Sequence, residues 1–242
     1  MEKLYEGKAK ILYKTEETDT LLMKFKDDLT SGNGAKKSSM QGKGAINATT
    51  SKKIFEHLET KKGISTHYLS SPSNTEHLVK DVKIIPVEVV MRNYAAGSIC
   101  RRYNIKSGYK FKIPLLELFY KDDDLNDPLV NEGVVLEMKW ATQEDLIQMQ
   151  EMANRVNQVM VKFFKKHELT LVDFKIEFGI DKNGKLLLAD ELTLDSMRLW
   201  DKNGDNLDKE LFRQDNNIEV VLDAYQYIHR IIGADKILEL YI

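Results

Sequence analysis

Two carboxylates that flank a strand–turn–strand pattern are the residues best suited to chemistry in this chain. Residues 172–178 alternate strictly between apolar and polar side chains, which predicts a half-buried β-strand. Asn183-Gly184 follows and is typical of a two-residue hairpin turn. Counting outward from that turn places Glu177 directly opposite Asp190. Facing carboxylates repel, and a shared Mg²⁺ removes the repulsion, so the pattern predicts a site for Mg²⁺ and nucleotide phosphates.

Two other interpretations of this hairpin stay open. A solvated hairpin whose charges share no function has the same residue pattern. A four-residue turn would shift one strand against the other and break the pairing of the two carboxylates. The spacing alone does not separate these interpretations.

A glycine and two lysines near the N-terminus indicate a second place where phosphate can bind. In the segment YEGKAK, Gly7 permits close approach of the backbone, and Lys8 and Lys10 fall on the same face of a strand. The segment lacks the longer glycine-rich loop and the Gly-Lys-Ser/Thr ending of a Walker motif. Taken alone, it is explained more simply as a solvated basic strand.

Two arginines in separate segments are suited to holding an anion. Arg92 ends an apolar run, and Ser98 lies where a helix is predicted to begin, so that free backbone N–H groups would be available. The alternative for Ser98 is a plain N-cap. Arg198 lies beside Trp200, where partial desolvation strengthens anion binding, and its alternative is a structural ion pair with Asp195.

The remaining polar residues give weaker signals. The segments 121–124 and 126–128 are rich in aspartate, which is common in solvated turns. The five histidines show no metal-ligand spacing, and no nucleophile-elbow or catalytic-triad signature is present.

The elements that must position these residues indicate an α+β chain. Residues 27–44 are predicted as a loop and residues 109–132 as irregular. The predicted strands cover residues 3–5, 9–14, 20–26, 67–69, 78–82, 84–91, 172–178 and 185–190, and the predicted helices cover residues 46–62, 96–103, 142–167 and 209–232. The order of these elements, in which strands come first and are later mixed with helices, predicts two lobes. The boundary is expected near residues 81–85, with a ligand cleft between the lobes.

Composition excludes several classes of protein. The chain has 242 residues, enough for one large domain or two lobes, and its formal net charge of −2 argues against a nucleic-acid partner. Cys100 is the single cysteine, which excludes a disulfide framework within the chain. The polar N-terminus does not resemble a signal peptide, and no apolar run approaches the roughly 18 residues of a membrane span. The sequence therefore predicts a soluble, cytoplasmic protein with no membrane partner.

Five motifs taken together resemble one enzyme family. The segments YEGKAK, VEVVMRNYAAGS, NDPLVNE, LVDFKIEFG and DELTLDSMRLWD occur in the order and at the distances found in the SAICAR synthetase family, over residues 4–225. The resemblance implies an ATP-dependent ligase of de novo purine biosynthesis. Such an enzyme joins the carboxylate of carboxyaminoimidazole ribonucleotide (CAIR) to the amine of L-aspartate, using ATP and Mg²⁺, and releases SAICAR, ADP and phosphate.

The resemblance also implies a fold and a quaternary structure. It implies a two-lobed SAICAR-synthase-like fold related to ATP-grasp enzymes. The small β-rich lobe, residues 1–82, would cover the nucleotide and resemble the small lobe of protein kinases. The larger α/β lobe, residues 83–242, would carry catalysis and substrate binding. A homodimer is a further implication.

Carried over position by position, the family motifs assign roles to fourteen residues of this chain. Glu177 and Asp190 would hold Mg²⁺, in agreement with the hairpin argument. ATP would contact Lys8, Ala9, Lys10, Lys80, Val82, Lys175, Glu177 and Asp190. CAIR would contact Arg92, Ser98, Asp195 and Arg198. The catalytic positions would be Lys10, Lys121, Asp127, Lys175 and Asp195.

The implied reaction passes through an acyl phosphate on CAIR and needs cations to bring anionic reactants together. Asp127 and Asp195 are candidates for the base that accepts the aspartate proton. One departure from the family pattern is Leu194, where the family often has proline, which predicts a less rigid loop. Two alternatives remain. A small-molecule phosphotransferase is opposed by the lack of HRD and DFG triplets, and a non-catalytic nucleotide-binding module would not need the paired carboxylates.

Overall fold

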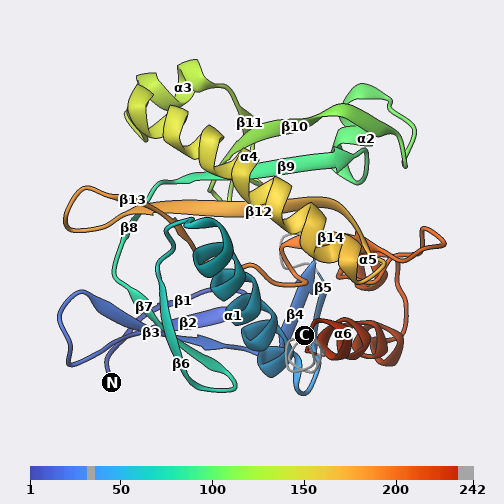
Figure 1. Cartoon of the computed structure of the whole chain (residues 1–242), viewed down its shortest axis with the longest axis horizontal. Coiled ribbons are helices and arrows are strands. Elements are labelled where there is room, and N and C mark those ends of the chain that lie inside the picture. Colours follow the sequence, from blue (N-terminus) through green and yellow to red (C-terminus); the bar gives the residue numbers. More distant parts are fainter. Residues whose placement is uncertain (32–35, 234–242) are drawn as a thin grey trace.

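Two antiparallel sheets form the framework of the protein (Figure 1). The computed structural model describes residues 1–31 and 36–233. The first sheet has the order β1-β2-β3-β7-β6 and is built entirely from the first third of the chain. Its strands are β1 (Lys3–Glu6), β2 (Lys10–Lys14), β3 (Thr20–Phe25), β6 (Tyr68–Ser73) and β7 (Glu76–Lys80).

The second sheet is centred on one long strand, β12, which pairs with four others. Its main order is β11-β10-β9-β12-β13, and β8 and β14 also pair with β12. Its strands are β8 (Lys83–Ile84), β9 (Val87–Tyr94), β10 (Lys110–Tyr120), β11 (Leu129–Val130), β12 (Thr170–Ile180), β13 (Leu186–Ala189) and β14 (Met197–Trp200). A separate hairpin joins β4 (Asp28–Ser31) to β5 (Lys36–Ser39).

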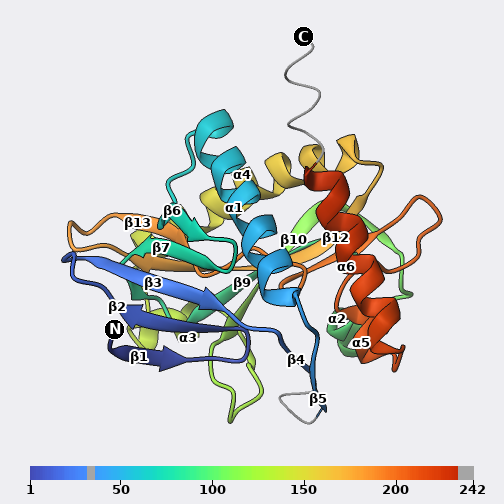
Figure 2. The ribbon, with the colours of Figure 1, turned by 90° about the horizontal axis from the view of Figure 1, so that it is seen from below.

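Helices cover the two sheets and connect them. They are α1 (Lys43–Lys62), α2 (Ser98–Tyr103), α3 (Glu132–Glu137), α4 (Gln143–Lys166), α5 (Glu210–Arg213) and α6 (Ile218–Gly233). Helix α1 packs on the first sheet and α4 on the second, and α1 also contacts α4 and α6 (Figures 1 and 2). A capping box begins α4, as the pair Thr142 and Asp145 in the sequence indicates: Thr142 Oγ accepts from the Asp145 N–H at 3.1 Å, and the Asp145 carboxylate accepts from the Thr142 N–H at 2.9 Å.

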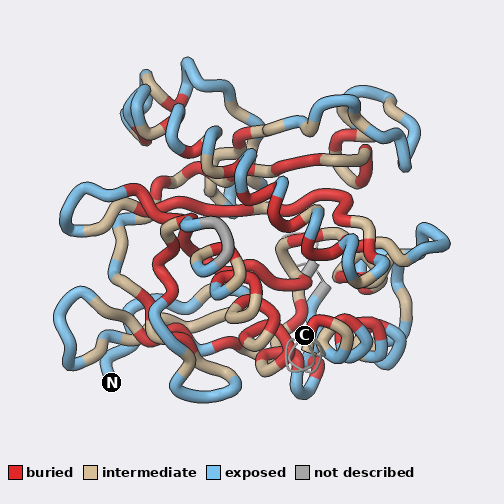
Figure 3. Tube along the Cα trace, viewed as in Figure 1, coloured by how far each residue is buried: buried red, intermediate tan, exposed pale blue. Residues whose placement is uncertain are grey.

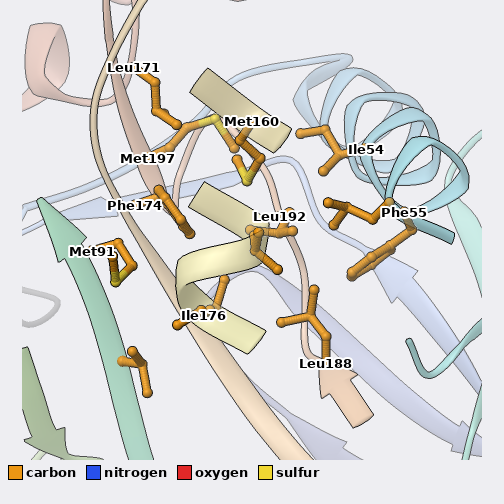
Figure 4. Packing of buried hydrophobic residues seen from close by; sticks show 14 of the residues in the cluster. Ile54, Phe55, Met91, Met160, Leu171, Phe174, Ile176, Leu188, Leu192 and Met197 are labelled. Atoms are coloured by element: carbon orange, nitrogen blue, oxygen red, sulfur yellow. The ribbon is translucent and has the colours of Figure 1, made fainter. Parts of the chain in front are cut away.

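The larger of two hydrophobic clusters combines the second sheet with α1, α4 and α6 and reaches the first sheet at Tyr68 of β6. The smaller cluster, of Met23, Phe25, Ala48 and Val79, lies between α1 and the first sheet. Figure 4 shows Ile54 and Phe55 of α1 facing Leu188 and Leu192, with Met160 of α4 close by. The buried parts of the chain in Figure 3 follow β12 and the inner faces of α1 and α4. The sheets divide near residues 81–83, and the larger cluster connects them only through Tyr68 and the helices, so the division into domains 1–82 and 83–242 stays a prediction.

The predicted register of the β12–β13 hairpin is wrong by one residue. Glu177 pairs with Ala189, not with Asp190. The loop is longer than expected, because the Asp181 N–H donates to the Lys185 carbonyl at 3.0 Å and the Asp181 carboxylate accepts from the Lys185 N–H at 2.9 Å. These bonds enclose three residues instead of two, and the extra residue shifts every pair further along the strands.

The prediction that β12 is half-buried is also wrong. Eight of its eleven residues are buried, including the acidic residues Asp173 and Glu177 of its polar face. The alternation is real, but the polar side faces other charged groups instead of water.

Three predicted segments differ from the structure. Residues 109–132 contain the long strand β10 and the helix α3 instead of irregular chain. The helix predicted at residues 209–232 is broken between α5 and α6, where Asp215 adopts a φ of 61°. The loop predicted at residues 27–44 contains the β4–β5 hairpin and the start of α1, and its residues 32–35 lie outside the described part of the chain. Across the described ranges, none of the helices has the length and apolar character that a membrane span requires.

Two buried histidines make the stability of this fold sensitive to acid. His67 donates to the Asp190 carbonyl and His77 to the Ala48 carbonyl, each at 2.9 Å, so each ring has a proton on Nε2. Burial lowers the pKa of each to about 4. The unfolded chain binds these protons near pH 6.5, so the stabilisation is complete above that pH and is lost as the pH falls toward 4.

We expect the free energy of unfolding in urea to decrease between pH 7 and pH 4, with about 3 kcal/mol arising from each buried histidine. The variant His77→Gln should show a shallower pH dependence than the wild type, because it lacks one of the two groups. Equal pH dependence in the two proteins would contradict the assignment.

Candidate functional site

A cavity of about 550 Å³ beside β9 and β12 brings together six of the fourteen predicted site residues. These residues come from strands, from the start of α2 and from the loops that follow β10 and β13. They are Arg92, Ser98, Asp127, Lys175, Asp195 and Arg198. The cavity is called the main cavity below. The sequence therefore identified residues that meet in space although they come from four separate segments of the chain.

Asp173 holds the two arginines of the main cavity side by side. Its Oδ2 accepts from Arg92 Nη1 and from Arg198 Nη1, each at 2.7 Å. Arg92 also pairs with Glu117 at 2.5 Å, and Arg198 with Glu210 at 3.0 Å. Burial opposes the charge on Arg198, but Asp173 and Glu210 outweigh it and raise the pKa of the guanidinium. The alternative of an Asp195–Arg198 ion pair is wrong, since the described partners of Arg198 are Asp173 and Glu210.

Ser98 lies under the two arginines as the first residue of α2, after the N-cap Gly97. Its hydroxyl accepts from Arg102 at 2.8 Å and from Arg92 at 3.4 Å. The alternative of a plain N-cap at Ser98 is therefore wrong. Gly97 has a φ of 65°, and a side chain at this position would overlap the Arg198 guanidinium. Glycine is required here both by the backbone conformation and by the close approach of the arginine.

A lysine–carboxylate cluster (Lys10, Lys121, Lys175, Glu177 and Asp190) adjoins the main cavity. Glu177 pairs with Lys175 at 2.7 Å and also with Lys121. Asp190 pairs with Lys10, which comes from the first sheet and also pairs with the neighbouring Glu191. The cluster thus joins residues from both sheets.

Opposing electrostatic effects set the protonation of this cluster. Burial disfavours the charge on Lys10, Lys121 and Lys175, but the nearby carboxylates outweigh burial and raise the pKa of all three amines. Burial likewise disfavours the Asp190 anion, yet Lys10 and Lys175 lower its pKa below the usual range. Every group of the cluster whose pKa shifts is therefore held in its charged form.

The donor set of the cluster fits Mg²⁺ when part of the coordination comes from outside the protein. Glu177 and Asp190 supply carboxylate oxygens, which Mg²⁺ prefers, and Mg²⁺ usually takes one or two carboxylates with waters and phosphate oxygens. Within residues 1–31 and 36–233, no three histidine, cysteine or acidic side chains are grouped closely enough to form a metal cage. The two residues would thus hold the ion together with a nucleotide.

Four other predicted residues lie outside the main cavity. Lys8 pairs with Asp123 at 2.7 Å and lines a second cavity of about 720 Å³ together with Lys26 and Lys37. The Ala9 carbonyl accepts from the Lys26 N–H at 2.8 Å. Lys80 and Val82 lie at the link between the two sheets, where Val82 packs against Gly179.

Several residues of the site were missed from the sequence. Asp173 lies on the polar face of β12 with Lys175 and Glu177, and that alternation was the signal that could have identified it. Glu117 falls in a segment predicted as irregular, and Lys43 in a segment predicted as a loop, so neither carried a signal. Glu88, Arg102 and Arg213 also line the main cavity, and Glu191 pairs with Lys10 of the lysine–carboxylate cluster.

Comparisons with known proteins agree over nearly the whole chain. The family model described as SAICAR synthetase matches residues 3–228. The phosphoribosylaminoimidazole-succinocarboxamide synthase of Staphylococcus carnosus is 46% identical over 227 residues, covering 93% of this chain and 96% of that protein. The enzyme of the same name from Methanocaldococcus jannaschii is 46% identical over 231 residues, covering 95% of this chain and 94% of that protein.

Solved structures agree as well. The crystal structure of the enzyme of that name from Ehrlichia chaffeensis has a TM-score of 0.92 at 38% identity, covering 96% of this chain and 99% of that chain. A SAICAR synthetase structure in complex with ADP has a TM-score of 0.89 at 38% identity, covering 94% of this chain and 96% of that chain.

The contact between Gly97 and Arg198 can be tested by substitution. Gly97→Ala adds backbone strain of about 1–2 kcal/mol, as any side chain does at positive φ, and steric overlap of about 1–3 kcal/mol. Gly184→Ala is the matched control, because Gly184 has a φ of 78° and no atom within 4 Å of the added methyl. We expect a larger loss of unfolding free energy in urea for Gly97→Ala. Equal losses would show that Arg198 moves aside freely.

Proposed function

This chain belongs to the SAICAR synthetase family, and we propose that it joins the carboxylate of CAIR to the amine of L-aspartate. The reaction consumes ATP, releases ADP and phosphate, and serves de novo purine biosynthesis. The observation that carries this proposal is the position of Lys175. It lines the main cavity with the two arginines and pairs with Glu177 of the lysine–carboxylate cluster at 2.7 Å. A site for an anionic substrate and a site for a nucleotide therefore share one side chain.

Arg92, Ser98 and Arg198 are proposed to hold the phosphate or carboxylate of CAIR. Asp173 holds the two guanidinium groups beside each other, because its Oδ2 accepts from both, so little side-chain freedom is lost when CAIR binds. Their fixed positive charge favours an anionic substrate in a cavity that is partly shielded from water.

Lys10, Lys121 and Lys175 are proposed to hold the phosphates of ATP, with Glu177 and Asp190 as ligands of Mg²⁺. When bound there, Mg²⁺ would offset negative charge on the phosphate oxygens. Lys175 both lines the main cavity and belongs to the lysine–carboxylate cluster, so it would stabilise the charge that develops when the γ-phosphoryl group moves to the CAIR carboxylate. The adenine is proposed to lie near Lys80 and Val82, at the link between the two sheets.

The chemistry needs no covalent bond to the protein. The CAIR carboxylate oxygen attacks the γ-phosphorus and ADP leaves, which gives an acyl phosphate. The aspartate amine then attacks the acyl carbon, and the C–O bond to phosphate breaks. Asp195 is a weak base for the amine proton, because Lys43 outweighs burial and lowers its pKa to about 2. Asp127, which lines the main cavity, is the better candidate for the base.

The finer features of the family complete this proposal. We propose a nucleotide-covering lobe at residues 1–82 that resembles the small lobe of protein kinases, and a relationship of the whole fold to ATP-grasp enzymes. The first sheet, which carries Lys8, Ala9 and Lys10 on or beside β2, is the feature that supports a nucleotide-covering role. A homodimer and a cytoplasmic location are part of the same proposal.

The function is tested by measuring ADP formation with each substrate omitted in turn. We expect turnover to require CAIR and L-aspartate together, with L-asparagine as an inactive control for aspartate. With ¹⁸O in the CAIR carboxylate, one labelled oxygen should appear in the released phosphate, because the C–O bond of the acyl phosphate breaks. ADP formation without CAIR would reject the ligase, and unlabelled phosphate would reject the acyl phosphate.

The roles of the two carboxylates are tested by Glu177→Gln and Asp190→Asn. Each keeps the shape of the side chain but removes a negative charge that would bind Mg²⁺. We expect turnover to fall by roughly 10²–10³-fold, and the Mg²⁺ concentration needed for half-maximal activity to rise. Asp205→Asn, at an exposed aspartate of the 201–205 loop, is the control and should behave as wild type. Wild-type activity of Asp190→Asn at the Mg²⁺ concentration that saturates the wild type would contradict the role of Asp190 as a Mg²⁺ ligand.

A further inference from the structure

Asp195 is fixed in the main cavity by side chains from two helices. Its Oδ1 accepts from the Tyr225 hydroxyl at 2.8 Å. Its Oδ2 accepts from the Asn47 amide at 3.1 Å and pairs with the Lys43 ammonium at 2.5 Å. Lys43 and Asn47 lie one turn apart on α1, and Tyr225 lies on α6, which packs beside α1 (Figure 2). The carboxylate therefore has little freedom to turn.

Lys43 is buried more completely than a lysine is usually found. Its exposed fraction is 0%, and its ammonium is satisfied by Asp195 and by the Asp28 carbonyl at 2.8 Å. Burying an ammonium and a carboxylate carries a desolvation penalty that the attraction between them often only balances. The gain in stability alone therefore does not explain a buried ion pair at this position. Its carboxylate, Asp195, lines the main cavity, which indicates a functional reason for the pair.

The three contacts leave Asp195 able to bind one more group. An ionised carboxylate has about four acceptor sites, and among the described residues Oδ1 accepts one hydrogen bond, from Tyr225. Asp195 lines the main cavity together with Arg198 and Ser196. In a cavity where arginines hold the anionic parts of a substrate, a fixed anion is suited to a donor group such as a hydroxyl or an amino group.

We propose that Lys43, Asn47 and Tyr225 are positioning residues, which orient Asp195 as a fixed acceptor for a hydroxyl or amino group of CAIR. This inference rests on the proposed function, since it takes CAIR as the occupant of the main cavity. Lys43 also keeps Asp195 ionised, because it lowers the pKa of that carboxyl to about 2 and so preserves the acceptor across the neutral range. The Lys43 contact to the Asp28 carbonyl further ties this acceptor to the start of β4.

The sharpest test is Tyr225→Phe, which removes one hydroxyl and keeps the buried ring. We expect the KM for CAIR to rise about tenfold, as for one lost hydrogen bond to a charged group, while the KM for ATP stays unchanged. Tyr227→Phe, on the exposed side of the same helix, is the matched control. An unchanged KM for CAIR, or an equal rise for CAIR and ATP, would overturn the proposal.

A second set of variants tests the charge on Lys43. Lys43→Met should raise the KM for CAIR more than Tyr225→Phe does, and Lys43→Arg should restore part of the loss because it keeps a cation beside Asp195. Lys52→Met, on an exposed part of α1, is the control. If Lys43→Met does not fold, Tyr225→Phe alone decides the question. Lys43→Met with wild-type KM values would overturn the role of the ion pair.

Calorimetric titration with CAIR separates this inference from the proposed function. If the wild type binds CAIR but forms no SAICAR, the ligase assignment fails, while weaker CAIR binding by Tyr225→Phe still supports the positioning role. If the wild type is an active ligase and Tyr225→Phe binds CAIR as tightly as the wild type, the positioning role alone is overturned.

Discussion

The polar face of β12 is the feature on which the rest of the structure depends. Asp173 and Glu177 are almost completely buried there, and a buried charge is stable only when it is paired. Asp173 is neutralised by Arg92 of β9 and Arg198 of β14, the strands that flank it in the sheet. At Asp173, the order of strands around β12 is therefore also the arrangement of cations, and another neighbour in place of β9 or β14 would remove one of its two partners.

The same requirement connects the two sheets. Lys10 belongs to β2 of the first sheet, and its partners Asp190 and Glu191 follow β13 of the second. On the proposed function, the charged residues that form this contact would exchange partners when substrates bind. A phosphate would replace the carboxylates beside Lys10 and Lys175, and Mg²⁺ would replace the ammonium groups beside Glu177 and Asp190. Each charge keeps a partner of opposite sign throughout, which limits the desolvation penalty of binding.

The sequence predicted the members of the site better than their geometry. Alternation along β12 and the capping box at Thr142 are local signals, and both correspond to the structure. The hairpin register failed because the Asp181 side chain stabilises a longer turn than Asn183-Gly184 suggests. Lys43 and Glu117 could not be identified, since their roles come from partners 152 and 25 residues away, respectively, and no local pattern encodes such a contact.

Pairing every cation of the site with a carboxylate also bears on selectivity. An open basic patch would attract any polyanion, but this chain has a net charge of −2 and its site lysines and arginines already have acidic partners. An incoming anion must displace those carboxylates. A bare phosphate would free Glu177 and Asp190 without offering them a replacement cation, whereas a nucleotide bound to Mg²⁺ supplies both the anion for the lysines and the cation for the carboxylates. On the proposed function, the neutralised site would therefore favour a metal-bound nucleotide over free phosphate, and its buried acidic residues would contribute to that preference together with the basic ones.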